Sequence, residues 1–340
     1  MDTNKLIGAL VRLGLDLKSK EGALYRRLMD ALPQITAANG WFTETEVGHA
    51  LASWSESLLA PSVERWLEKY KLPAQHVRRV VIIMAGNIPL VGLHDVLCVL
   101  ASGNHAIIKT SSDDPLLTRI VLEQLITIAP ECKERITFVE GKIPSCDAII
   151  ATGNNSSARY FEYYFRHIPR LIRKNRNSVA ILTGKEDAGQ LKDLGIDIFR
   201  YFGLGCRSVS SVLVPESYNF STFFEQMVAY GDIIHHQKYA NNYDYQRACF
   251  LLNNIPFLDN HFLLLTKSSQ PGSAVAVLHY HEYKDTTDID AYLTTNKAQL
   301  QCIVSAESTL FSSVLPGQAQ HPRLDDYADN EDTLSFLLSI

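Results

Sequence analysis

The stretch Val80-Val81-Ile82-Ile83-Met84, followed by Ala85-Gly86-Asn87-Ile88-Pro89, decides the fold. Five consecutive apolar residues are typical of a strand that is buried on both faces of a sheet. Glycine and proline end that strand, and apolar residues at helical spacing follow from Leu90 to Leu100. A buried strand joined to a helix by a short loop predicts the first half of a strand–helix–strand unit, and hence a parallel sheet.

The same alternation continues along the chain. Further strands are predicted at 105–109, 136–139 and 147–151, with helices at 115–128 and after Thr152. A second α/β segment begins near Ser178, with strands predicted at 179–182, 209–215, 262–265 and 274–278. Residues up to about Leu72 are predicted to be helical. This spacing is typical of doubly wound sheets, whose ligands bind at the carboxyl ends of the strands.

Composition and charge exclude several classes of protein. The chain has 340 residues, 46% hydrophobic and 20% charged, as expected for a globular protein of about two domains. The net charge of −5 argues against nucleic acid as a partner, although the run 166–176 is basic. No apolar stretch is long enough to span a bilayer, and the first residues lack a signal-peptide pattern. The six cysteines form no CxxC pair, so we expect a cytoplasmic protein with reduced thiols.

Three loops at the predicted strand ends suit an anionic dinucleotide. They are residues 85–89, 109–114 and 152–157. Lys109 carries a fixed charge, and Thr110, Ser111 and Ser112 add hydroxyl donors. Thr152-Gly153-Asn154 opens a helix, where backbone N–H groups favour phosphate. Each loop alone is compatible with turn chemistry, and no GxGxxG fingerprint is present. Three such loops at one sheet edge nevertheless favour a dinucleotide site.

The stretch Gly203-Leu204-Gly205-Cys206-Arg207-Ser208 lies between a predicted helix and the predicted strand 209–215. Glycines let a backbone approach a bound group closely, and a sulfur beside Arg207 at such a junction is placed for nucleophilic catalysis. A buried structural thiol is the alternative interpretation. His279 and His281 share one face of a predicted strand, but no carboxylate or cysteine pattern completes a metal site, so none is predicted.

Several of these pieces, in this order, resemble the aldehyde dehydrogenase superfamily. Gly86-Asn87-Ile88-Pro89 resembles the family's Trp-Asn-Phe-Pro motif, whose asparagine donates to an oxyanion. Residues 107–116 are similar to the segment whose lysine meets the adenosine ribose, and 151–154 are similar to the phosphate loop. Gly205-Cys206 resembles the nucleophile segment. The resemblance implies an α/β fold of two α/β domains, with a Rossmann-like doubly wound parallel sheet for the cofactor and an N-terminal helical segment.

The resemblance also implies roles for individual residues. Cys206 and Asn87 would be catalytic. The cofactor would be bound by Met84, Ala85, Lys109, Thr110, Ser111, Ser112, Thr152, Gly153 and Asn154. The implied division is a helical segment 1–75, a dinucleotide-binding domain 76–176, a catalytic domain 177–315 and a return segment 316–340.

The resemblance further implies NADPH as the cofactor, with NADH as the alternative. NAD-selective relatives place a carboxylate three positions after the ribose lysine, and this chain has the neutral Ser112 there. The neighbouring Asp113 and Asp114 are expected to cap the next helix rather than to oppose a phosphate.

Two departures narrow the resemblance. Aldehyde-oxidising relatives activate water with a glutamate in Glu-Leu-Gly-Gly, but residues 171–178 contain no carboxylate and hold Arg173 near that place. An enzyme without this base is not expected to hydrolyse a thioester readily. The glutamate that holds the nicotinamide ribose is also missing, near Ser269 or Gln270. These features, with the Arg-Lys-Asn-Arg insert, make the resemblance closest to the LuxC-type acyl-CoA reductases.

The implied reaction is NAD(P)H-dependent reduction of an acyl-CoA, a fatty acyl-CoA among the candidates, to an aldehyde through a Cys206 thioacyl-enzyme. The implied state is a homo-oligomer with a small-molecule acyl-CoA or aldehyde substrate, without nucleic acid or a membrane span. Two alternatives stay open. One is an aldehyde dehydrogenase working in the oxidative direction, and the other is a non-catalytic α/β protein that binds a dinucleotide.

Overall fold

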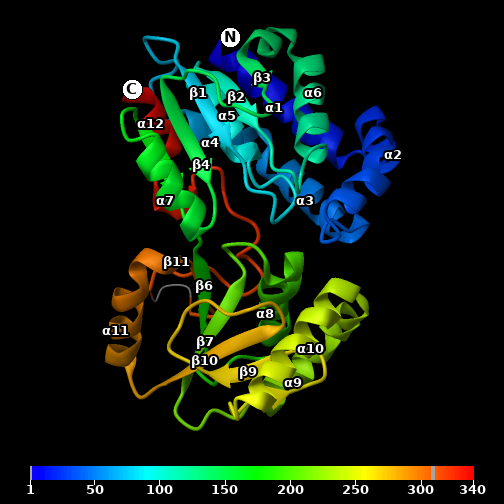
Figure 1. Ribbon diagram of the computed structural model, residues 1–340, viewed down its shortest axis with the longest axis vertical. Coiled ribbons are helices and arrows are strands. Elements are labelled where there is room, and N and C mark those ends of the chain that lie inside the picture. Colours follow the sequence, from blue (N-terminus) through cyan, green and yellow to red (C-terminus); the bar gives the residue numbers. More distant parts are fainter. Residues whose placement is uncertain (1, 308–310) are drawn as a thin grey trace. The chain divides into compact units, whose positions relative to one another are not determined.

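The computed structural model describes residues 2–307 and 311–340, which form two compact units (Figure 1). Unit 1 comprises Met1–Asn175 and Pro322–Ile340, and unit 2 comprises Arg176–His321. The four-part division expected from the sequence is finer than these two units and stays a prediction. Within the described ranges, each helix is too short or insufficiently apolar to cross a membrane.

Unit 1 is built on a five-stranded parallel sheet of order β3-β2-β1-β4-β5. Its strands are β1 Arg79–Ile83, β2 His105–Lys109, β3 Ile136–Phe138, β4 Ala148–Thr152 and β5 Arg170–Arg173. The central strand β1 pairs Val81 with Ile107 of β2 and with Ile149 of β4. The chain runs outward from β1 to β3 and then crosses to β4, so the predicted doubly wound parallel sheet is confirmed.

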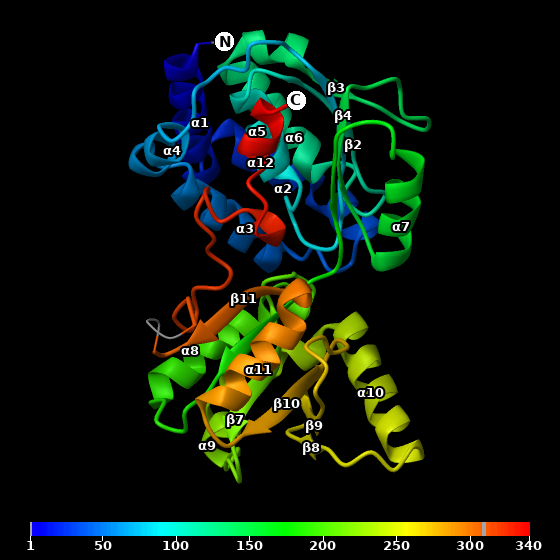
Figure 2. The same ribbon diagram turned by 90° about the vertical axis from the view of Figure 1, so that its left-hand side faces the viewer.

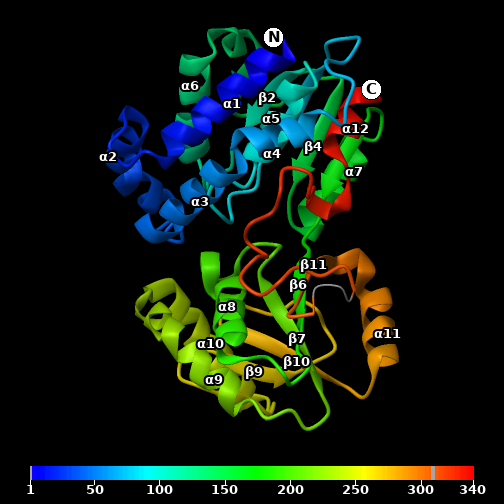
Figure 3. The ribbon, with the colours of Figure 1, turned by 180° about the vertical axis from the view of Figure 1, so that it is seen from behind.

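Helices cover both faces of this sheet. The α-helices of unit 1 are α1 Thr3–Lys18, α2 Ala23–Ala38, α3 Glu44–Ser57, α4 Ala60–Leu67, α5 Leu93–Ala101, α6 Leu117–Ile128, α7 Asn155–Tyr164 and α12 Thr333–Leu338. Phe161 and Phe165, in and after α7, pack against the face that carries Val81 and Ile149. Figure 2 shows α5 and α12 on the opposite face. The N-terminal helices α1 and α2 pack against α6 (Figure 3).

Unit 2 contains a six-stranded sheet of order β11-β6-β7-β10-β9-β8. The strands are β6 Asn177–Ile181, β7 Val209–Pro215, β8 Leu258–Asp259, β9 Leu264–Lys267, β10 Val277–Tyr283 and β11 Leu300–Ser305, with only the β8–β9 pairing antiparallel among the described residues. The helices are α8 Ala188–Phe199, α9 Ser221–Met227, α10 Gln237–Leu252 and α11 Thr286–Asn296. Apolar residues of α8 and α9 pack on one sheet face, and those of α11 pack on the other.

Short 3-10 helices complete the described structure, at Pro130–Arg135, Arg200–Gly203, Val228–His235, Lys297–Gln299 and Ala328–Asn330. Two predicted strands of unit 2 begin later than the sequence pattern indicated. Ala276, inside the predicted strand 274–278, has φ +64°, which interrupts an extended backbone. Strand β10 therefore begins at Val277 and continues to Tyr283, and β9 begins at Leu264, two residues later than predicted.

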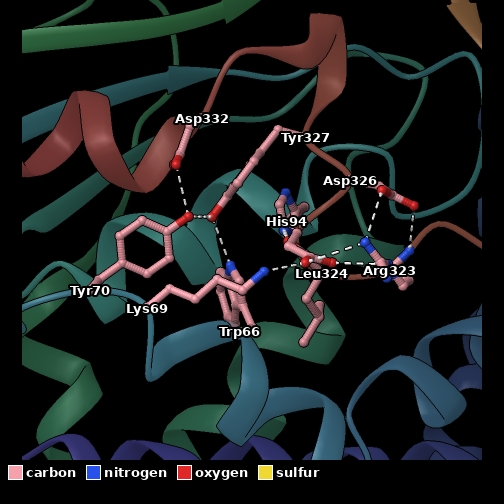
Figure 4. A network of polar contacts seen from close by, with 10 residues as sticks. Trp66, Lys69, Tyr70, His94, Arg323, Leu324, Asp326, Tyr327 and Asp332 are labelled. Carbon is pink, nitrogen blue, oxygen red and sulfur yellow. Dashed lines mark hydrogen bonds and ion pairs between the residues drawn. The ribbon is translucent and has the colours of Figure 1, made fainter. Parts of the chain in front are cut away.

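A polar network holds the C-terminal segment to unit 1 (Figure 4). The indole of Trp66 donates to the Tyr327 hydroxyl over 2.8 Å, and the Tyr70 hydroxyl donates to Asp332 over 2.8 Å. The His94 ring donates from Nε2 to the Leu324 carbonyl over 2.9 Å. Burial lowers the pKa of His94, which favours the neutral ring. These contacts explain why residues 322–340 belong to unit 1 despite their distance in sequence.

Candidate active site

Two of the three predicted cofactor loops meet at the carboxyl ends of β1 and β2. The buried Asn39 amide donates to the Gly86 carbonyl over 2.9 Å and holds the first loop in place. A Cβ added to Gly86 would lie 2.7 Å from the Ser111 Oγ, which is closer than real contacts allow. Only glycine fits this close approach, so the loops 85–89 and 109–114 are packed directly on one another.

The second loop presents the positive charge of Lys109, several hydroxyl groups and the exposed carboxylate of Asp113. The Lys109 ammonium donates to the Gly141 carbonyl over 2.8 Å, and Ser112 is exposed. Asp114 is buried and accepts from the Leu117 N–H over 3.0 Å and the Thr118 hydroxyl over 2.6 Å. Asp114 therefore caps α6, as expected from the sequence, and its carboxylate is directed at that helix. Asp113, for which the same role was expected, is exposed. Burial raises the pKa of Asp114.

The third loop opens α7 at the end of β4. The Asn154 side chain accepts from the Ser157 N–H over 2.8 Å and caps the helix. A Cβ added to Gly153 would lie 2.9 Å from the Ser157 Cβ, so this position also requires glycine. Strands β1 and β4 are parallel, with Ile83 opposite Ala151, so this loop leaves the same sheet edge as the other two.

These three loops fit an anionic dinucleotide. Two of them pass so close to a neighbouring serine that glycine is required at the point of contact, which fixes their course. Around them lie the partly exposed polar groups of Lys109, Thr110, Ser111 and Thr152. Met84 is buried and Ala85 is partly exposed at the same strand end. The donor set is suited to phosphate and ribose groups, while contact of any single residue with a cofactor stays a prediction.

A strained turn precedes Cys206 in unit 2. Tyr201 has φ +54° and Phe202 has φ +55°, two consecutive side-chain-bearing residues in the left-handed region. Such residues cost on the order of 1–3 kcal/mol each unless their surroundings hold them. Both rings are buried, and the Phe202 ring lies 4.4 Å from the His236 ring, between centroids. Packing thus fixes a sharp reversal between α8 and the nucleophile segment.

The backbone around Cys206 is tied down by hydrogen bonds. The Ser178 hydroxyl donates to the Cys206 carbonyl over 3.0 Å, and the Gly205 N–H donates to the Ser208 Oγ over 3.2 Å. The Ser208 N–H returns to the Gly205 carbonyl over 2.9 Å. The cysteine is half-buried and stands just before β7, at the helix–strand junction that the sequence predicted.

The guanidinium of Arg207 contacts Ala319 and Cys302 rather than the thiol of the adjacent Cys206. Its Nε donates to the Ala319 carbonyl over 2.5 Å, and its Nη2 lies 3.7 Å from the Cys302 sulfur. Burial raises the pKa of the Cys98 and Cys132 thiols, which makes them poor nucleophiles at neutral pH. Cys206 is therefore a better candidate than these buried thiols on exposure. Its backbone setting between α8 and β7, rather than a pairing with Arg207, distinguishes it from the half-buried Cys146 and Cys249.

Arg173, which the sequence resemblance puts near the missing glutamate, is held in a buried ion pair. It is 5% exposed at the end of β5. Its Nη1 donates to both oxygens of Asp95 on α5, over 2.6 and 2.5 Å, and its Nη2 donates to the Thr333 hydroxyl over 2.7 Å. The Asp95 carboxylate is thus engaged by this cation. Sequence reasoning missed Asp95, although a lone acid among apolar helix residues was a signal.

The two predicted catalytic residues lie in different units. Asn87 is half-buried in the loop after β1, and Cys206 is in unit 2. Their pairing around one oxyanion stays a prediction.

Over residues 2–307 and 311–340, no group of three or more His, Cys, Asp or Glu side chains is arranged to hold a metal ion. The His279 ring bonds from Nδ1 to the Gln270 carbonyl over 3.0 Å.

Comparison with known sequences identifies relatives of one type. The family described as Acyl-CoA reductase (LuxC) matches residues 65–229. The long-chain acyl-protein thioester reductase of Aliivibrio fischeri is 23% identical, over 91% of this chain and 73% of its own length. The long-chain acyl-protein thioester reductase 2 of Photobacterium leiognathi is 25% identical, over 67% of this chain and 53% of its own length.

Comparison with solved structures gives the fold. Aldehyde dehydrogenase 21 from Physcomitrella patens, solved with succinate, superimposes with a TM-score of 0.71 at 12% identity, over all of this chain and 84% of that chain. The aldehyde dehydrogenase KauB from Pseudomonas aeruginosa gives 0.65 at 16% identity, over 90% of this chain and 72% of that chain. The predicted oxidoreductase class agrees with these relatives. The chain thus has the fold of the aldehyde dehydrogenase superfamily and is similar in sequence to the LuxC acyl-CoA reductases.

Proposed function

We propose that this chain reduces an acyl-CoA to the aldehyde, with NADPH as the preferred reductant, through a thioacyl-enzyme on Cys206. The observation that carries the proposal is the buried Arg173–Asp95 pair. The sequence resemblance puts Arg173 near the glutamate with which aldehyde-oxidising relatives activate water, and here that side chain is a cation engaged by Asp95. Without that base, a thioacyl-enzyme survives long enough to be reduced rather than hydrolysed.

The chain supplies the nucleophile and the oxyanion donors. The Cys206 Sγ bonds to the acyl carbon, the bond from that carbon to the CoA sulfur breaks, and CoA leaves as a thiol after taking up a proton. The Asn87 amide and the Cys206 backbone N–H donate to the developing oxyanion, an effect of about 3–4 kcal/mol per donor in comparable sites. A bound nicotinamide cofactor supplies the hydride that reduces the acyl carbon.

Product release regenerates the enzyme. The carbon–sulfur bond of the Cys206 thiohemiacetal breaks, the aldehyde leaves, and the sulfur returns as a thiolate. The balance is one acyl-CoA, one NAD(P)H and one proton consumed for one aldehyde, one CoA thiol and one NAD(P)⁺. Both relatives are named as long-chain acyl-protein thioester reductases, which supports reduction of a thioester in general, and the CoA carrier is our proposal. The homo-oligomer and the cytoplasmic location stay predictions.

The test is a panel of acyl-CoA substrates of increasing chain length, with NADPH or NADH, followed by loss of nicotinamide absorbance and chemical trapping of the aldehyde. We expect absorbance loss that depends on the acyl-CoA and equals the trapped aldehyde. Aldehyde converted to acid without CoA would instead establish the oxidative alternative. If no acyl-CoA is turned over and none acylates the protein, the non-catalytic dinucleotide-binding alternative is the one that stands.

The preference for NADPH is tested at Ser112. The wild type should show a higher kcat/KM for NADPH than for NADH, because the exposed Ser112 hydroxyl and the Lys109 ammonium would donate hydrogen bonds to a 2′-phosphate. Ser112→Glu should lower kcat/KM for NADPH by about tenfold or more through like-charge repulsion, with little effect on NADH. Ser112→Gln is the neutral control of similar size. A wild type that strongly prefers NADH, or equal effects of Glu and Gln, would contradict this view of the loop.

A further inference from the structure

A buried carboxylate lies in the helix that leads to the nucleophile turn. Asp197 of α8 has no exposed surface. Its two oxygens accept from two different backbone groups, the Gly317 N–H over 2.6 Å and the Ala319 N–H over 3.0 Å. Gly317 has φ +80°, and a Cβ there would lie 3.2 Å from the Asp193 Cβ, so the segment 317–320 lies close against α8.

The same segment contacts the turn that carries Cys206. The Ala319 carbonyl accepts from the Arg207 Nε over 2.5 Å, and the Gln320 amide donates to the Ser208 Oγ over 3.3 Å. The two residues after the cysteine are therefore both bound to the segment that Asp197 holds. Every one of these contacts lies within unit 2.

Burial disfavours the charged form of Asp197, and its hydrogen bonds oppose this effect. Desolvation raises the pKa of Asp197 to about 7, while the two N–H donors and the charges of Arg200 and Arg207 act in the opposite direction. Burying an acid is unfavourable unless its hydrogen bonds compensate for the loss of water. An apolar residue could be buried at this helix position at lower cost, but it could not accept hydrogen bonds from the Gly317 and Ala319 N–H groups.

We propose that Asp197 is a positioning residue for Cys206, acting through residues 317–320, which link it to Arg207 and Ser208. The catalytic importance of that positioning rests on the function proposed above. The physical link itself does not, because it is a property of the folded unit and can be measured without substrate.

Asp197→Asn tests the link with little change in volume. Since Gly317 and Ala319 donate to different oxygens, an asparagine can accept only one of the two and sets its amide group against the other N–H. Amide hydrogen exchange, followed by mass spectrometry on peptides that cover 203–208 and 317–320, should be about tenfold faster in both segments. Asp290→Asn, which changes an exposed carboxylate of unit 2 on α11, is the matched control and should leave both segments unchanged.

A second variant guards against misfolding of the first. Gln320→Ala cuts the connection at its other end and should speed exchange at 203–208 while the Gly317 amide stays protected by Asp197. Faster exchange confined to 317–320 in Asp197→Asn, with 203–208 as in the wild type, would overturn the proposal. So would unchanged exchange at 203–208 in Gln320→Ala.

The kinetic readout separates positioning from general loss of structure. In the acyl-CoA assay, Asp197→Asn should lower kcat by about tenfold and leave KM unchanged, because substrate contacts are not touched. A wild type without any acyl-CoA activity would defeat the proposed function, yet the exchange result would still decide the role of Asp197.

Discussion

Cys206→Ala should abolish acylation of the protein and lower acyl-CoA reduction by about 10⁴-fold or more, as expected when a covalent nucleophile is removed. The reason is that alanine has no atom that can form the thioester. The measurement is the intact mass of the protein after incubation with an acyl-CoA in the absence of reductant. The wild type should gain the mass of one acyl group, and the variant should gain none, while its binding of reduced cofactor stays within about twofold.

The matched control is Cys249→Ala, which removes another half-buried thiol of unit 2, on α10. That variant should be acylated and active like the wild type. If Cys206→Ala still gains the acyl mass, the nucleophile is another residue, and peptide mapping of the adduct would identify it.

Arg173→Met should destabilise the protein by about 3–5 kcal/mol, the cost expected when a buried ion pair loses one partner. Both Asp95 oxygens would lose their donor in a site where the Asp95 and Arg173 side chains are 4% and 6% exposed. The Thr333 hydroxyl would lose its contact with the Arg173 Nη2 as well. The effect is measured as a lowered midpoint of thermal or urea unfolding, monitored by tryptophan fluorescence, since the three tryptophans lie in unit 1.

A double variant distinguishes loss of the ion pair from loss of volume. Asp95→Leu combined with Arg173→Met replaces both charges by apolar groups and should recover most of the lost stability. Arg170→Met, an exposed position on the same strand, should have little effect. If Arg173→Met unfolds at the wild-type midpoint, the pair is not a support of this fold.

The sequence was most informative where burial is uniform. Strands β1, β2, β4 and β7 were predictable because most of their residues are apolar and buried, which leaves a continuous signal along the chain. Strand β5 was missed because it begins and ends with arginines. The burial of Arg173 depends on Asp95, 78 positions earlier, and on Thr333, 160 positions later, and no local pattern records such partners.

The candidate site was predictable only in its parts. Loops that follow buried strands marked the cofactor edge, and glycines marked the Cys206 turn. The role of Asp197 could not be found in this way, because its partners Gly317 and Ala319 lie about 120 positions away. Likewise, the left-handed Tyr201 and Phe202 have no sequence signature, since aromatic residues rarely adopt that conformation and packing alone fixes it here.

Unit 1 is made of two chain segments that are separated by all of unit 2, and this affects folding during synthesis. Unit 2 is one continuous segment, whereas unit 1 needs residues 322–340, which emerge from the ribosome after all of unit 2. At a translation rate of about 5–20 residues per second, these residues are synthesised roughly ten to thirty seconds after Asn175. Until then α12 cannot cover α5, and Tyr70 and Arg173 lack their partners Asp332 and Thr333. The second unit can therefore finish folding first, and the nascent first half is the form most exposed to proteases and aggregation.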